Sequence, residues 1–145
     1  MAIKQARLPE SAEDQFPTAV SVEANDTFFW MSGATAIPLY HHHPHVPEEC
    51  VLPDDIREQA RRVLRTFDEV LRFNGLGWHN VVKFSQFLTD MREHDDVQEV
   101  IEEFFAGVGW TPASSVVGIN HLSAPGARLE IDVVAAWPHD GQEDA

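Results

Sequence analysis

The stretch Val81-Val82-Lys83-Phe84-Ser85-Gln86-Phe87-Leu88 carries apolar side chains at both sets of alternating positions. Successive side chains of a β-strand point to opposite faces of the sheet. One face of this strand would carry Val82, Phe84, Gln86 and Leu88, and the other would carry Val81, Lys83, Ser85 and Phe87. Apolar residues on both faces are typical of a strand in the middle of a covered sheet. We therefore predict a central strand at residues 81–88.

A helix is predicted on each side of this strand. Before it, Asp54 and Asp55 place carboxylates where a helix N-terminus favours them, and Asn74-Gly75 supplies a left-handed termination. Between these ends, apolar residues recur at three- and four-residue spacing over about five turns. They are Ile56, Ala60, Val63, Leu64, Phe67, Val70 and Leu71. After the strand, a second helical pattern runs from about Arg92 to Phe105.

Four further stretches have the β-branched and aromatic composition of strands. They are Ala19–Glu23, Thr27–Ser32, Ser114–Ile119 and Arg128–Ala136. Ala24-Asn25-Asp26, between the first two, suits a hairpin turn. The order of elements predicts an α+β fold with two helices packed on one face of a mixed sheet. The opposite face would stay wet in a monomer although two strands are apolar on both faces, so we expect self-association.

Composition restricts the class of protein and its partners. The 145 residues, 43% of them hydrophobic, suit one domain at 16–138, with flexible segments at 1–15 and 139–145. A formal net charge of −14 repels phosphate backbones and anionic membrane surfaces, so nucleic acid is not an expected partner. No apolar run approaches the roughly 20 residues needed to span a bilayer. The single cysteine, Cys50, and the polar opening segment favour the cytoplasm.

Residues 33–53 contain prolines and histidines at a density that neither a helix interior nor a central strand accepts. Long loops of this kind either shape a binding site or are disordered. His41, His43 and His45 alternate and could hold a metal, but Pro44 disturbs their geometry and no Cys or acidic ligand follows at a regular spacing. We expect no metal and no other cofactor. The alternatives are a solvated loop, or a rim that supplies one imidazole as proton carrier or hydrogen-bond donor.

Five stretches occur together in an order and spacing typical of one known family. They are Ser32–Gly33 with Ile37–Pro38, the 81–89 strand closed by Asp90, Val97 to Phe105, Pro112-Ala113-Ser114-Ser115, and Leu129-Glu130-Ile131-Asp132-Val133-Val134-Ala135. Over roughly Phe16 to Pro138 the chain resembles the Rid family, also called the YjgF/YER057c/UK114 or endoribonuclease L-PSP-like family. The resemblance implies a chorismate-mutase-like (YjgF-like) fold and a homotrimer, with a pocket at each subunit interface.

The resemblance also implies a chemistry. The best-understood family members hydrolyse enamines and imines derived from amino acids, releasing ammonia and a keto acid. Their pocket arginine, in a Pro-Ala-Arg-Ser motif, grips the substrate carboxylate, and Ser114 occupies that position here. A serine hydroxyl offers a neutral hydrogen bond in place of a charge-assisted bidentate contact, so ordinary 2-imino acids are expected to be poor substrates.

Other family positions carry over unevenly. Glu130 matches the glutamate that positions or activates the attacking water, which a partly buried carboxylate can do; the alternative is an exposed strand carboxylate. Ser32 and Gly33 match residues that line the pocket. The family tyrosine falls on Phe16, which lacks the hydroxyl, and a cysteine found in many members falls on Val116.

Two basic residues could replace the missing arginine. Arg128 lies two residues before Glu130 and would share its strand face, and Lys83 lies on the central strand. Each is alternatively a surface residue without a role in binding.

The leading interpretation is a Rid-like small-molecule enzyme, a hydrolase or deaminase that acts on an imine, enamine or related reactive metabolite in a pocket between subunits. One alternative is a trimer that binds a metabolite without catalysis and regulates a partner. Another is a lyase or hydrolase of a catabolic or biosynthetic pathway, because one fold hosts several chemistries.

Overall fold

The computed structural model describes residues 4–6, 19–21, 26–38, 41–42 and 44–137. Phe16 and the predicted tail at 139–145 lie outside these ranges. The strands are β1 (Lys4–Ala6), β2 (Ala19–Ser21), β3 (Thr27–Trp30), β4 (Val81–Leu88), β5 (Ala113–Gly118) and β6 (Leu129–Trp137). The helices are α1 (Ile56–Phe73) and α2 (His94–Phe105), with short 3-10 turns η1 (Pro47–Glu49), η2 (Trp78–Asn80) and η3 (Met91–Glu93).

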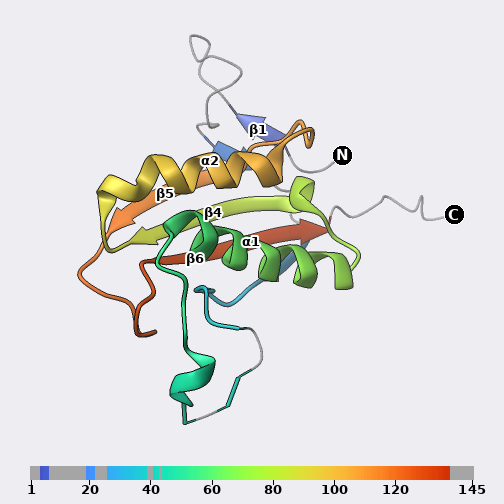
Figure 1. The fold of residues 1–145 in the computed structure, drawn as a ribbon. Helices are drawn as coiled ribbons and strands as arrows, with labels where there is room; N and C mark the ends of the chain where they lie inside the picture. The colour runs from blue at the N-terminus through green and yellow to red at the C-terminus, as the bar shows by residue number, and fades with distance from the viewer. Residues whose placement is uncertain (1–3, 7–18, 22–25, 39–40, 43, 138–145) are drawn as a thin grey trace, which may run out of the picture.

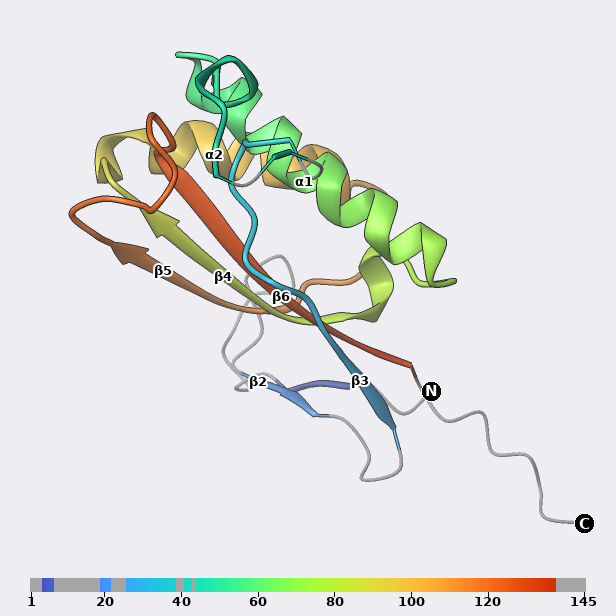
Figure 2. The same cartoon turned by 90° about the horizontal axis from the view of Figure 1, so that it is seen from below.

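The main sheet has the strand order β3-β6-β4-β5. The predicted central strand β4 pairs antiparallel with β6 and parallel with β5, so the sheet is mixed. Both helices pack on one face, as Figures 1 and 2 show. The structure therefore confirms the predicted α+β fold. No helix in the described ranges is both long enough and apolar enough to cross a membrane.

The predicted hairpin between the first two strands is wrong. β2 pairs with β1, whereas β3 pairs with β6, placing Phe29 opposite Ala135. This pairing lets Phe29 pack against the main core. The β1–β2 ladder lies on the side of the sheet away from the helices (Figure 2).

The predicted limits of α1 agree with its capping chemistry. The Asp55 side chain accepts a hydrogen bond from the backbone N–H of Arg57 at 2.9 Å, which satisfies one unpaired donor of the first turn. At the other end Gly75 adopts φ +71°, the left-handed conformation that glycine tolerates best. α2 begins at His94 rather than near Arg92, because Asp90 caps the preceding 3-10 turn η3 by accepting from the Arg92 N–H.

The two faces of β4 differ from strict alternation at one point. The register with β6 shifts between Val81 and Lys83, where an extra residue forms an irregularity. Val81 therefore joins the helix-side core, with Phe84 and Leu88, while Val82 packs on the other side against Ala136. The prediction that Val81 lies opposite to Phe84 is thus wrong.

The sheet face without helices is only partly covered. On β3, Phe28 and Trp30 point to this side and are 42% and 75% exposed. Val117 of β5 is 44% exposed and pairs with Phe87, which lies on the same face. This face therefore presents apolar area that the described chain leaves accessible to solvent.

Gln59 of α1 joins three separate segments of chain. Its side chain is fully buried, and its amide donates to the Pro53 carbonyl at 2.8 Å and to the Gly126 carbonyl at 3.1 Å. Its carbonyl oxygen accepts from the Arg128 N–H at 3.0 Å. These bonds satisfy a buried amide and fix the turn before β6 onto the helix.

Candidate functional site

Glu130 lies near the start of β6, on the face away from the helices. Its neighbours Leu129 and Ile131 are fully buried on the helix side, so alternation turns Glu130 and Asp132 to the other face. Glu130 is half-buried. Burial raises the pKa of its carboxyl above the ordinary value, and the negative charge of Asp132 raises it further. Such a carboxyl exchanges protons closer to neutral pH than an exposed one does.

Gly33 lies directly beside these two carboxylates. A Cβ atom at this position would lie 2.4 Å from Oε1 of Glu130 and 2.4 Å from Oδ1 of Asp132. The chain here stays paired with β6, because Ala34 exchanges backbone hydrogen bonds with Ile131 at 3.0 Å in both directions. The close approach therefore depends on glycine at 33; its role in a substrate site stays a prediction.

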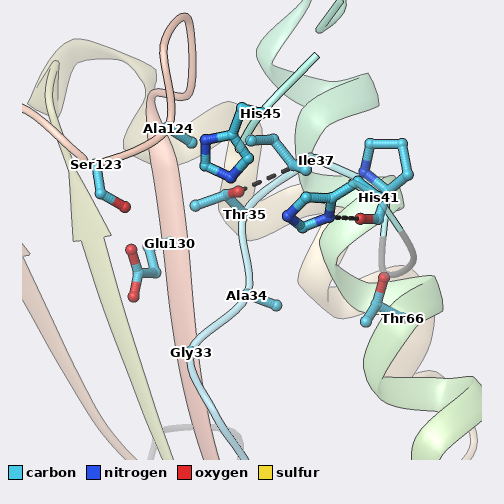
Figure 3. A pocket seen from close by; sticks show the side chains of 11 residues that line it. Gly33, Ala34, Thr35, Ile37, His41, His45, Thr66, Ser123, Ala124 and Glu130 are labelled. Atoms are coloured by element: carbon cyan, nitrogen blue, oxygen red, sulfur yellow. Dashed lines mark hydrogen bonds between the residues drawn. The ribbon is translucent and has the colours of Figure 1, made fainter. Parts of the chain in front are cut away.

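A cavity of about 230 Å³ opens next to Glu130 (Figure 3). Its walls come from the segment after β3, the histidine loop, α1, the turn before β6, and β6 itself. The lining residues are Gly33, Ala34, Thr35, Ile37, Pro38, His41, His45, Thr66, Ser123, Ala124 and Glu130. Glu130 and Ser123 lie on one side of it, and the two histidines lie on the other, with Thr35 between (Figure 3).

Ser32 lines a neighbouring groove rather than this cavity. The groove lies between the end of β3 and α1, has a volume of about 300 Å³, and shares Gly33, Ala34 and Thr66 with the cavity. Trp30 also lines the groove. The structure thus places Ser32, Gly33 and Glu130 in one region of the molecule.

The histidine loop contributes two imidazoles to the cavity. His41 Nδ1 lies 2.7 Å from the Pro38 carbonyl oxygen, and the rings of His41 and His45 have centroids 5.1 Å apart. His42 takes no part and instead contacts Glu49 with its Nδ1 at 2.6 Å. In the described ranges, no three His, Cys, Asp or Glu side chains gather as metal ligands; His43 lies outside those ranges. The absence of a required metal stays a prediction.

Ser114 and Val116 lie elsewhere in the single chain. They belong to β5, where Ser114 pairs with Phe84 and Val116 with Gln86, both of which are buried on the helix side of β4. In the strand order, β4 separates β5 from β6. Neither residue lines the cavity. One chain therefore does not bring them together with Glu130, and their predicted roles require a second copy.

The two alternative cations already have partners. Arg128 precedes β6, and its guanidinium binds Glu93, with Nε 2.9 Å from Oε2, and donates to the Asp54 carbonyl. Lys83 Nζ donates to the Ser115 hydroxyl at 2.9 Å on the face away from the helices. Neither residue is among those that line the cavity.

Sequence reasoning missed three polar residues around Glu130. Asp132 could have been found, because residues two apart on a strand share a face. Thr66 and Ser123 gave no such signal, since one lies on a helix and the other in a turn far away in sequence. Only the tertiary fold brings their hydroxyls to the cavity.

The chain matches proteins of known family along most of its length. Residues 10–137 match the family described as endoribonuclease L-PSP. A "RutC family protein" of Aquifex aeolicus is 28% identical over 133 residues, covering 92% of this chain and 98% of that protein. The mouse "2-iminobutanoate/2-iminopropanoate deaminase" is 31% identical over 85 residues, covering 59% of this chain and 61% of that protein.

A solved structure supports the same assignment at the level of fold. A protein of the conserved Rid family from Yersinia pestis superposes with a TM-score of 0.75 at 20% identity, and the match covers 94% of this chain and all of that one. The mixed sheet with two helices thus agrees with the predicted YjgF-like fold. This chain belongs to the endoribonuclease L-PSP family, which is the Rid family.

Proposed function

We propose that this protein hydrolyses small imines or enamines to a carbonyl compound and ammonia, with Glu130 as the group that positions and deprotonates water. The observation that carries the proposal is a half-buried carboxyl with a raised pKa, held beside Gly33 at the wall of a cavity. The presence in the family of a protein named as an imine deaminase supports this class of reaction.

The arrangement supplies each proton transfer that imine hydrolysis needs. Glu130 accepts a proton from water while the water oxygen bonds to the imine carbon, and it then gives that proton to the imine nitrogen, which becomes an amine. Glu130 next accepts the proton of the new hydroxyl as the carbon–nitrogen bond breaks, and passes it to the departing nitrogen, which leaves as ammonia. The net change is C=NH plus H₂O to C=O plus NH₃, and a raised carboxyl pKa suits a group that both takes and gives protons.

We further propose that the working site lies between two subunits of a homotrimer. The exposed Phe28, Trp30 and Val117 give the open sheet face a surface that self-association would bury. A second copy is also the simplest way to bring Ser114 and Val116 near Glu130, since one chain keeps them apart.

The test is ammonia release from imines generated freshly from several amino acids by an amino-acid oxidase. Wild-type protein should accelerate release, and Glu130→Gln should reduce kcat by about a hundredfold or more. Glu69→Gln is the matched control, because Glu69 is exposed on α1 outside the cavity. Ligand-induced thermal stabilisation without turnover would instead support the binding protein. Unchanged turnover in Glu130→Gln would refute the catalytic assignment.

A further inference from the structure

The cavity beside Glu130 is electrically asymmetric. Its lining places a carboxyl on one wall and the imidazoles of His41 and His45 on the other (Figure 3). Among the described residues that line it there is no lysine or arginine. An anionic end of a ligand in this cavity can therefore meet positive charge only at these two histidines, unless a second subunit contributes a cation.

Contacts within the histidine loop orient the ring of His41 and hold the neighbouring His42. Only a donor can pair with a carbonyl, so His41 donates from Nδ1 to the Pro38 oxygen at 2.7 Å, which orients the ring. Glu49 accepts from the His42 backbone N–H at 2.8 Å and contacts His42 Nδ1 at 2.6 Å. This contact joins the loop to η1 at His42, which lies between His41 and His45 in the sequence. The hydrogen bonds from His42 also lower the pKa of the Glu49 carboxyl.

The imidazole rings lie at a spacing that suits one small anion. Their centroids are 5.1 Å apart and their planes are inclined by 42°, so both rings lie within reach of one small carboxylate held in the cavity. Among the described residues, Glu49 of η1 interacts electrostatically with His41, and Glu130 of β6 lines the same cavity as both rings. No second cation competes with the imidazoles for a ligand inside the described lining.

We propose that His41 and His45 bind the carboxylate of a 2-imino or 2-oxo acid and thereby replace the arginine that is absent at Ser114. The carbon–nitrogen bond of the substrate then faces Glu130 across the cavity. This inference rests on the proposed function and assigns its substrate class, a small 2-imino acid whose carboxylate contacts the two histidines. It modifies the expectation that ordinary 2-imino acids are poor substrates, because two imidazoles take the place of the arginine as carboxylate anchor.

The test measures binding of 2-oxobutanoate and of its uncharged methyl ester by isothermal titration calorimetry. At pH 6 the wild-type protein should prefer the acid, and the preference should fall by about tenfold in the His41→Gln/His45→Gln double variant. His79→Gln, an exposed histidine outside the cavity, is the matched control and should change nothing.

The outcomes separate this inference from the proposed function. If the double variant keeps the preference, or if wild type binds neither probe at millimolar concentration, the histidine anchor is refuted. Glu130→Gln should abolish turnover yet retain the preference for the acid. If wild type shows no turnover of imines but still prefers the acid to its methyl ester, the proposed hydrolase activity is refuted and the histidine anchor is not. Thermal unfolding of each variant at the same protein concentration checks that the fold persists.

Discussion

The two faces of the sheet serve different purposes in this molecule. On the helix side, Phe67, Phe84 and Leu129 are almost fully buried, and the face is occupied by close packing. The other side of the sheet carries Glu130 and Asp132 together with the exposed Phe28 and Trp30. The difference shows that the helix side holds the close-packed core of the chain, whereas the open side exposes carboxylates and apolar side chains.

The largest effect should come from the helix side. Phe67 is 2% exposed, so Phe67→Ala should lower the free energy of unfolding by about 3–5 kcal/mol, through lost burial and the cavity left behind. Phe73→Ala on the same helix is the control, because that side chain is 90% exposed and should change stability by less than about 0.5 kcal/mol. Urea unfolding at a fixed protein concentration measures both, and similar losses would contradict the division between faces.

The open face should be covered by other copies of the chain. Three chains of 16.3 kDa should give a particle of about 49 kDa that persists on dilution into the micromolar range. Multi-angle light scattering across that concentration range measures the mass of the particle. A stable monomer would mean that the apolar open face has another purpose, and it would remove the pocket proposed between subunits.

Replacing Gly33 tests whether activity depends on the close approach of its backbone to Glu130 and Asp132. Gly33→Ala should push the Glu130 and Asp132 carboxylates away and reduce kcat/KM for imine hydrolysis by about tenfold, because small displacements of reacting groups slow catalysis. Gly118→Ala is the matched control, since its Cβ would meet only the flexible Met91 side chain, 3.0 Å away. An equal loss in both variants would point to a general effect of lost glycine.

Ser114 tests whether the β5 edge joins the site in the assembly. Ser114→Arg should raise kcat/KM for 2-imino acids by about tenfold through a charge-assisted contact. Ser115→Arg, on the other face of the same strand, should give no gain. If wild type already matches Ser114→Arg, another group anchors the carboxylate, and His41 and His45 are the first to test.

The smallest effect concerns the stability cost of keeping Glu130 in its place. A folded-state pKa raised above the unfolded value gives stability that is fully present below the unfolded pKa and is lost as pH rises through the folded pKa. Glu130→Gln should therefore raise the Tm near pH 7.5 relative to wild type, and less so near pH 4. Differential scanning calorimetry at both pH values measures the Tm of each protein, with Glu69→Gln as control. A lower Tm for Glu130→Gln at pH 7.5 would contradict the raised pKa.

Much of the fold followed from periodicity. Asp55, Gly75 and the spacing of apolar residues between them predicted α1 almost to the residue, because capping and amphipathicity are local properties. The pairing of β2 and the irregularity at Val82 were not predicted, since strand partners and bulges depend on contacts between distant segments. Gln86, which is 1% exposed with its Oε1 unpaired among the described atoms, gave no warning in the sequence.

The residues of the candidate site were likewise predicted only in part from the sequence. Glu130 and Gly33 were predicted from the family resemblance, and the structure places them in contact range of each other. The place of His41 and His45 in the cavity wall was open from the sequence, because a proline-rich loop has no periodicity to orient its side chains. Arg128 was expected to face Glu130, but its guanidinium turns to Glu93 because it precedes the first paired residue of β6.

The buried amide of Gln59 has a consequence for engineering this protein. It fixes both the start of α1 and the turn that carries Ser123 and Ala124, so that part of the cavity wall tolerates little change. Within the described part of the histidine loop, His42 contacts Glu49 through its backbone N–H and its ring. A mutant library that randomises positions 41 and 45 while retaining Gln59, His42 and Glu49 should therefore yield mostly folded proteins. Such a library would vary ligand choice on a constant scaffold.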